Sequence, residues 1–239
     1  MNFQVLSEQS FDCLISFIKY IIPCIIALLL IHFLLKVPSY VFRKCLHLVA
    51  FTCVTVMIVC AESWQAAVIA SVIIIIVIYP VLSLLERQAW FAPLFVQKSR
   101  GEIKRSLVML FGMFAVLTAV SWGLFGNVCA CAAAILMWGT GDAAAALVGI
   151  PYGNHKIKLK ITDGKKSLEG TAAMFIVSTA AGFATLYFYG KYPPGRSFVC
   201  ALVGGILGAL TELISPSEYD TVTVPSVILA VELIILHIF

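Results

Sequence analysis

The amino-acid sequence contains little charge. Only 12% of its 239 residues are Asp, Glu, Lys or Arg, whereas 62% are hydrophobic. Soluble domains are about 25% charged and about 45–50% apolar. Together with a mean hydropathy of +1.04, this composition excludes a soluble enzyme, a disordered tail and a coiled coil, and it indicates an integral membrane protein. The net charge of +4 is spread over loops, so we expect no nucleic-acid partner.

Two further features are missing. No CxxC pair occurs among the eight cysteines, and most of these lie inside apolar runs. We therefore interpret them as small apolar residues, not as a disulfide framework or a metal site. The N-terminal stretch MNFQVLSEQSFD has no basic residues of the kind that open a cleaved signal peptide, so we expect no cleaved signal here.

The long apolar runs predict the fold class. A helix needs about 20 apolar residues to cross a bilayer, and the sequence offers eight such runs. We predict an all-α, polytopic protein that forms one transmembrane domain over residues 1–239. Seven spans are an alternative, because the second run is short and the last has little chain behind it. The expected spans are residues 14–35, 46–61, 64–85, 107–125, 128–149, 170–189, 197–214 and 223–239.

The distribution of Lys and Arg predicts the orientation. Of the 16 Lys and Arg residues, three follow the first span, five follow the third and five follow the fifth. With eight spans, these segments share one side, and the positive-inside rule places that side in the cytoplasm and both termini outside. We expect the functional loops at 86–106, 150–169 and 215–222. The protein itself is expected in the cell membrane or the endoplasmic reticulum membrane.

Asp142 is the most unusual residue, because it interrupts an apolar span within Trp138-Gly-Thr-Gly-Asp142. A carboxylate inside a membrane span costs at least a few kcal/mol and usually faces an interior partner. A structural pairing with Lys or Arg of a neighbouring span is one interpretation. The flanking Gly139 and Gly141 allow either a close backbone approach or a break in the helix. A break would direct peptide N–H groups at an anion.

Three further clusters carry basic residues, the usual ligands of phosphate. They are Arg43-Lys44-x-x-His47, Ser99-Arg-Gly-Glu-x-Lys-Arg-Ser106 and Gly164-Lys-Lys-Ser-Leu-Glu-Gly-Thr171. Two acids, Glu212 and Asp220, are expected at the same membrane level as Asp142. Mg²⁺ is usually held by one or two carboxylates plus substrate phosphates, so the pattern indicates a nucleotide–Mg²⁺ site beside lipid.

A transporter is a more distant alternative. Transporters place ionisable groups near the midplane and often show inverted repeats. Spans 1–4 and 5–8 share no motif in corresponding positions, which favours the enzyme.

These motifs resemble a known family. The segments RKCLH (43–47), SRGEIKRS (99–106), WGTGDAAAALVG (138–149), DGKKSLEGT (163–171) and TELISPSEYDTVTVP (211–225) are similar to those of the CTP-dependent lipid kinases. That group contains dolichol kinase, phytol kinase and the yeast-type diacylglycerol kinase, and it is related to membrane CTP:phosphatidate cytidylyltransferases. The resemblance runs in order from about residue 40 to 225. Thr221 stands where the family commonly has Asn.

The resemblance implies Mg²⁺-dependent phosphoryl transfer from CTP to a lipid alcohol (a polyprenol, a phytol-like alcohol or diacylglycerol) at the cytoplasmic face. The alternative is CTP:phosphatidate cytidylyltransferase. The proton acceptor is either a carboxylate or His47, and the sequence leaves the lipid acceptor and the oligomeric state open. The predicted site residues are Asp142, His47, Lys166 and Glu169 for catalysis; Arg43, Lys44, Arg100, Arg105, Gly141, Lys165, Ser167 and Gly170 for nucleotide binding; and Asp142, Glu212 and Asp220 for Mg²⁺.

Overall fold

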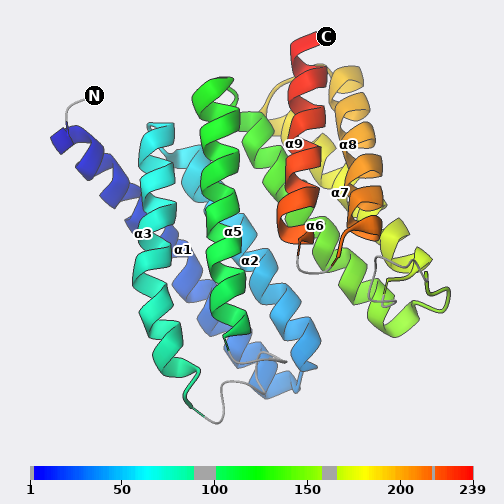
Figure 1. Cartoon of the computed structure of the whole chain (residues 1–239), viewed down its shortest axis with the longest axis horizontal. Helices are drawn as coiled ribbons and strands as arrows, with labels where there is room; N and C mark the ends of the chain where they lie inside the picture. Colours follow the sequence, from blue (N-terminus) through cyan, green and yellow to red (C-terminus); the bar gives the residue numbers. More distant parts are fainter. Residues whose placement is uncertain (1–2, 89–100, 158–165, 217–218, 239) are drawn as a thin grey trace. The chain divides into compact units, whose positions relative to one another are not determined.

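The computed structural model describes residues 3–88, 101–157, 166–216 and 219–238. These residues form eight helices that are long and apolar enough to cross a membrane, which confirms the predicted all-α polytopic fold and the count of eight (Figure 1). The elements are α1 (Phe3–Leu35), α2 (Ser39–Cys60), α3 (Trp64–Leu85), α5 (Glu102–Thr118), a π-helical turn η1 (Ala119–Leu124), α6 (Val128–Tyr152), α7 (Leu168–Ala184), a second π-helical turn η2 (Thr185–Tyr189), α8 (Pro194–Ile214) and α9 (Asp220–Ile238).

Several helices begin before the apolar runs that predicted them. The first helix starts at Phe3 and the second at Ser39, whereas hydropathy placed their starts at 14 and 46. A helix can project beyond the hydrocarbon with polar side chains, which hydropathy does not detect. As a result, the RKCLH motif lies within α2 and does not precede it.

The helix starts that matter for the site are specified locally. The side chain of Asn127 accepts a hydrogen bond from Ala130 N at 2.9 Å and caps α6. Ser167 caps α7 by accepting from Gly170 N at 3.2 Å. Pro194 occupies the first turn of α8. A backbone N–H at this position has no acceptor within the helix, so proline, which lacks the N–H, costs no hydrogen bond there.

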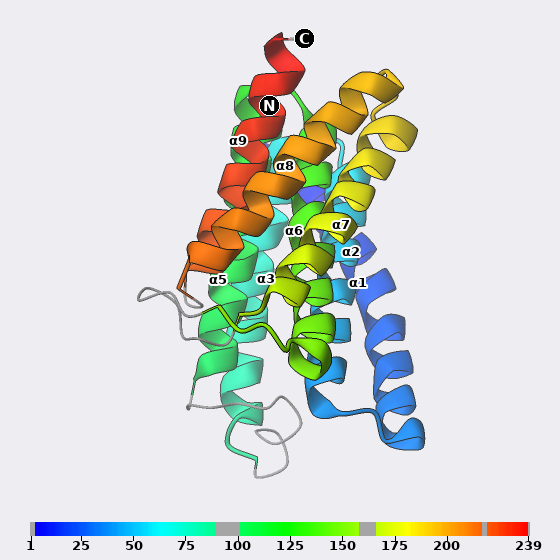
Figure 2. The same ribbon diagram turned by 90° about the vertical axis from the view of Figure 1, so that its right-hand side faces the viewer.

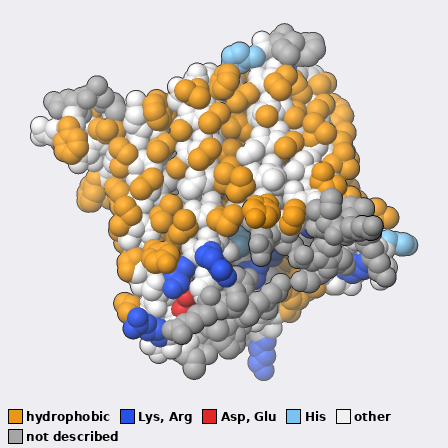
Figure 3. All heavy atoms as spheres, viewed as in Figure 1, with side chains coloured by type: hydrophobic (Ala, Val, Ile, Leu, Met, Phe, Trp, Pro, Cys, Tyr) orange, Lys and Arg blue, Asp and Glu red, His pale blue; other side chains and the backbone are white. Residues whose placement is uncertain are grey.

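The chain divides into two compact units, Met1–Ala119 (unit 1) and Val120–Phe239 (unit 2). In unit 1, aromatic rings from three helices form part of the core. Phe111 of α5 packs edge-to-face on Phe17 of α1, and Phe114 of α5 packs in the same way on Phe51 of α2. Figure 3 shows hydrophobic side chains along much of α3 and α5, with Lys and Arg side chains gathered at one end of these helices.

In unit 2, α6, α7, α8 and α9 pack in that order, and α9 returns to contact α6, as Figure 2 allows the reader to follow. The helices approach closely at small residues. A Cβ at Gly141 of α6 would overlap Ser178 Oγ of α7, and one at Gly205 of α8 would overlap Thr179 Oγ1 of α7. Such contacts are typical of helix packing in membranes, where van der Waals fit replaces the hydrophobic drive.

The close contact at Gly205 predicts a specific sensitivity. We expect Gly205→Ala to destabilise unit 2 by about 1–3 kcal/mol, because the added methyl group must push α8 away from Thr179. Thermal unfolding in detergent would measure the loss. Gly195→Ala is the matched control, since it lies on the same helix and nothing lies within 4 Å of the added Cβ. Equal melting temperatures for the two variants would contradict the close approach.

Candidate functional site

The described residues that connect α6 to α7 and open α7 carry four of the fourteen predicted site residues. A Cβ at Gly153 would overlap the carbonyl oxygen of Gly149 and the side chain of Ser167. Ile157 N donates to Lys166 O at 2.9 Å, and Leu168 N donates to His155 O at 3.0 Å. These two bonds join the ends of segment 158–165 in an isolated antiparallel bridge. The start of α7 is therefore fixed beside the end of α6.

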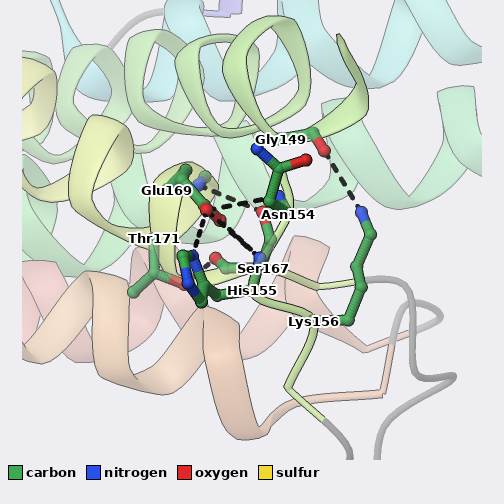
Figure 4. A network of polar contacts seen from close by, with 8 residues as sticks. Gly149, Asn154, His155, Lys156, Ser167, Glu169 and Thr171 are labelled. Atoms are coloured by element: carbon green, nitrogen blue, oxygen red, sulfur yellow. Dashed lines mark hydrogen bonds and ion pairs between the residues drawn. The ribbon is translucent and has the colours of Figure 1, made fainter. Parts of the chain in front are cut away.

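Glu169 organises this turn (Figure 4). Its carboxylate accepts hydrogen bonds from the backbone N–H groups of Asn154 at 3.2 Å and His155 at 3.1 Å. The carboxylate also lies 2.7 Å from Nδ1 of the His155 ring, and this contact is an ion pair when the imidazole is protonated. On the other side of the turn, Lys156 Nζ donates to the carbonyl of Gly149 at 3.2 Å. Glu169 thus holds the polar turn against the first turn of α7.

Two further predicted residues have clear local roles. Ser167 is the capping residue of α7, and its backbone oxygen also accepts from the Thr171 hydroxyl at 3.1 Å. Gly170 allows α7 to approach α6, because a Cβ there would lie 2.9 Å from Ala145 O and 3.3 Å from Gly149 Cα. The serine and the glycine of the GKKSLEGT motif therefore build the helix start, whatever else they do.

Lys166 connects this turn to the end of α8. Its ammonium donates to the carbonyl oxygens of Glu212 and Ser215, the second at 3.0 Å, and it pairs with Glu212 Oε1 at 3.1 Å. Both side chains are largely buried, with 11% of Lys166 and 14% of Glu212 exposed. A cation at a helix C-terminus is also favoured by the helix dipole. The structure thus brings together two predicted site residues that are 46 positions apart.

Ser215 follows the same end of α8. The hydroxyls of Ser215 and Thr223 are 2.8 Å apart. Asp220 opens α9, and its Oδ1 accepts from the Thr221 hydroxyl at 3.3 Å. The Thr221 hydroxyl therefore supports the carboxylate of Asp220 directly.

Asp142 lies on an unbroken stretch of α6. Gly141 serves close packing, because a Cβ there would overlap Ser178 Oγ and crowd Met174 of α7. The helix break considered from the sequence does not occur in α6. Asp142 is partly exposed, whereas its neighbours Gly141 and Ala143 are buried.

The helix register separates Asp142 from Glu212. Gly141 meets Ser178 of α7, and the next residue of α7, Thr179, meets Gly205 of α8. Glu212 lies seven residues beyond Gly205, which corresponds to about 10 Å along the helix. Because Asp142 follows Gly141 toward that end of the unit and Thr179 lies one residue deeper than Ser178, Asp142 is about 7 Å, or between one and two helical turns, deeper than Glu212. The expectation that the three carboxylates share one level does not hold for Asp142.

The remaining predicted residues divide between unit 1 and the segments outside the described residues. Arg43, Lys44 and His47 lie in the first turns of α2, and all three are partly exposed. Arg105 lies in the first turn of α5 and is exposed. Arg100 and Lys165 lie outside the described residues.

The described side chains of the candidate site include both cations and carboxylates. Among them, no group of three or more His, Cys, Asp and Glu side chains is arranged to hold a metal ion. The cations of the turn, Lys156 and Lys166, lie with the carboxylates of Glu169 and Glu212 at one end of unit 2. His155 was not among the predicted site residues. Its pairing with Glu169 joins positions 14 residues apart, and no sequence pattern signals it.

Comparison of the chain with models of known protein families, with curated proteins and with solved structures finds no match.

The Lys166 contacts predict a difference between two neighbouring lysines. We expect Lys166→Met to lower the free energy of unfolding by about 1–3 kcal/mol, because it leaves the Glu212 carboxylate and two carbonyl oxygens without their donor. Lys156→Met, at an exposed position, should change it by less than about 0.5 kcal/mol. Thermal unfolding of both variants checks this. Adding Glu212→Gln to Lys166→Met should recover part of the loss, and no recovery would show that the pair does not form.

Proposed function

We propose that this protein is a CTP-dependent, Mg²⁺-requiring lipid kinase that phosphorylates a membrane lipid alcohol at the cytoplasmic face. The observation that carries the proposal is the polar turn between α6 and α7. It gathers Lys166, Glu169 and Glu212 at one end of a unit made of apolar helices. Phosphate-binding cations and carboxylates beside lipid are what transfer from a nucleotide to a membrane alcohol requires.

The order of the motifs supports the same reaction. The RKCLH, SRGEIKRS, WGTGD, DGKKSLEGT and TELISPSEYD segments follow one another as they do in the lipid kinases that the sequence resembles. In the reaction, the lipid hydroxyl oxygen attacks the γ-phosphorus of CTP, the bond from that phosphorus to the bridging oxygen breaks, and CDP leaves. The hydroxyl proton passes to a base, for which His47 and the carboxylates are candidates.

The residues available for Mg²⁺ fit a site completed by the nucleotide. Mg²⁺ keeps several waters and is usually held by one or two protein carboxylates with substrate phosphates, so it does not need a cluster of three protein ligands. Asp142 would be one such ligand, with Glu212 or Asp220 as the candidate for a second. When bound, the ion would neutralise charge on the phosphates. Lys166 and Glu212 neutralise each other in the described conformation, and a triphosphate would offer Lys166 a more strongly charged partner.

A cytidylyltransferase is the second candidate. It would use the same nucleotide, but a lipid phosphate would attack the α-phosphorus and pyrophosphate would leave. It needs a second anion site, and the RKCLH and SRGEIKRS motifs carry basic residues of the kind that bind a phosphate. The RKxxH motif favours the kinase.

The Asp142 assignment gives the first prediction for activity. We expect Asp142→Asn to fold and insert normally but to lose at least about 100-fold in kcat/KM, because an amide cannot replace an anionic ligand of Mg²⁺. Thr140→Val is the matched control on the same helix, since the Thr140 hydroxyl bonds only locally, to Leu136 O. The measurement is CTP-dependent labelling of lipid by the purified variants. Near-normal turnover of Asp142→Asn would make Asp142 a structural residue.

Labelled CTP separates the two enzymes. The purified protein receives CTP labelled at the γ-phosphorus or at the α-phosphorus, with a neutral lipid alcohol or with phosphatidate as the acceptor. We expect label in the lipid only from γ-labelled CTP with the alcohol, and CDP as the second product. Label from α-labelled CTP with phosphatidate, together with pyrophosphate, would establish the cytidylyltransferase instead. No transfer from either nucleotide to either acceptor would reject both enzymes.

A further inference from the structure

An apolar groove lies on unit 2 between α7 and α8. It has a volume of about 400 Å³ and is lined by Phe175, Ile176, Thr179, Ala180, Phe183 and Phe198. Binding sites for small molecules are typically apolar hollows of about 300–1,000 Å³. This groove lies within the apolar length of two helices that are long enough to span a membrane, so hydrocarbon chains surround it.

The floor of the groove follows from the packing of α7 on α8. Thr179 of α7 directs its hydroxyl at Gly205 of α8, where the missing side chain lets the two helices meet. That hydroxyl is buried and has no hydrogen-bond partner among the described residues. The rest of the lining is hydrocarbon and aromatic, which suits an alkyl or isoprenoid chain and offers nothing to a polar headgroup.

Aromatic rings mark one end of the groove. Phe183 of α7 packs edge-to-face on Phe198 of α8 at 6.4 Å, and it stacks on Tyr187 at 5.5 Å. In the opposite direction, α7 runs back from Phe175 to its first turn, where Glu169 lies in the polar turn described above. The groove and the polar turn therefore lie along a single helix.

The helix rise sets the distance between them. At 1.5 Å per residue, Phe175 lies about 9 Å and Phe183 about 21 Å along α7 from Glu169. A lipid alcohol whose hydroxyl reaches the polar turn would carry its tail along this length of α7. We propose that the α7–α8 groove binds the hydrocarbon tail of the lipid acceptor, an inference that rests on the lipid-kinase function proposed above. The Phe183–Phe198 pair then limits how much of the tail is held.

Photo-crosslinking tests the occupant directly. The full chain is placed in phosphatidylcholine nanodiscs without nucleotide. The probe is a long-chain primary alcohol with a diazirine on its tail, about 9–21 Å from the hydroxyl to match the helix rise. We expect adducts on residues 175–183 and on Phe198, and we expect an unlabelled long-chain alcohol to compete for them. Adducts that extra phosphatidylcholine removes equally well would show bulk lipid in the groove, and cross-links to a second protein chain would show a dimer contact. Either result would overturn the proposal.

Two tryptophan variants provide the matched comparison. Ala180→Trp fills the groove from an exposed position, whereas Val177→Trp adds the same ring at an exposed position of α7 outside the lining. We expect Ala180→Trp to reduce the adducts about tenfold and Val177→Trp to leave them unchanged. In the transfer assay, Ala180→Trp should raise KM for a long-chain alcohol about tenfold while kcat and the KM for a short soluble alcohol stay unchanged. Equal effects of the two variants would overturn the proposal.

The two arms separate this inference from the proposed function. Cross-linking uses no nucleotide. Specific adducts together with an absence of CTP-dependent transfer would therefore reject the kinase function but support the tail-binding groove. Transfer to the alcohol without specific adducts would keep the kinase and reject the groove.

Discussion

Small residues allow the helices of unit 2 to come together. Lipid tails are as apolar as the helix surfaces, so burial alone does not drive association, and close van der Waals contact has to do so. The contacts of Gly141 with Ser178 and of Gly205 with Thr179 meet this need. They also fix the register between α6, α7 and α8. That register decides which polar side chains meet at the end of the unit, so the Lys166–Glu212 pair and the position of Ser167 beside Gly149 both depend on it.

The motif residues at the start of α7 illustrate how one sequence pattern serves two demands. Ser167 caps the helix and Gly170 lets it approach α6, so structure alone already requires both residues. Lys166 and Glu169 are different, because a helix start can be built without either side chain. Their charges hold the neighbouring loop and the end of α8 in place. Charged groups that position two backbones at a membrane end are also well placed to respond to an anionic ligand, since phosphates would compete for the same cation.

The sequence predicted the number of spans because apolar runs and the clustering of Lys and Arg are properties of short segments. It misplaced the start of α2 because Arg43 and Lys44, near the beginning of that helix, interrupt the apolar run from which hydropathy identifies a span. It placed Asp142 level with Glu212 because the order of segments gives no information on how far one helix slides along another. The Lys166–Glu212 pair could not be predicted from the sequence for the same reason. Its members are 46 residues apart, and they meet only when α7 and α8 pack in this register. The role proposed for each charged residue stays a prediction.

Asp142 of α6 and Glu232 of α9 lie away from the ends of their helices, and their surroundings differ. Glu232 of α9 is fully buried, and neither oxygen has a hydrogen-bond partner among the described residues. Cys129 of α6 and Cys200 of α8, both buried, lie close enough to interact with it, so a ligand would have to part three helices to reach it. Asp142 keeps partial exposure between two buried neighbours, and a ligand can reach it without opening the helix packing. An intramembrane acid acts on a substrate only if the substrate can touch it, so accessibility favours Asp142, and not Glu232, as the acid of the proposed reaction.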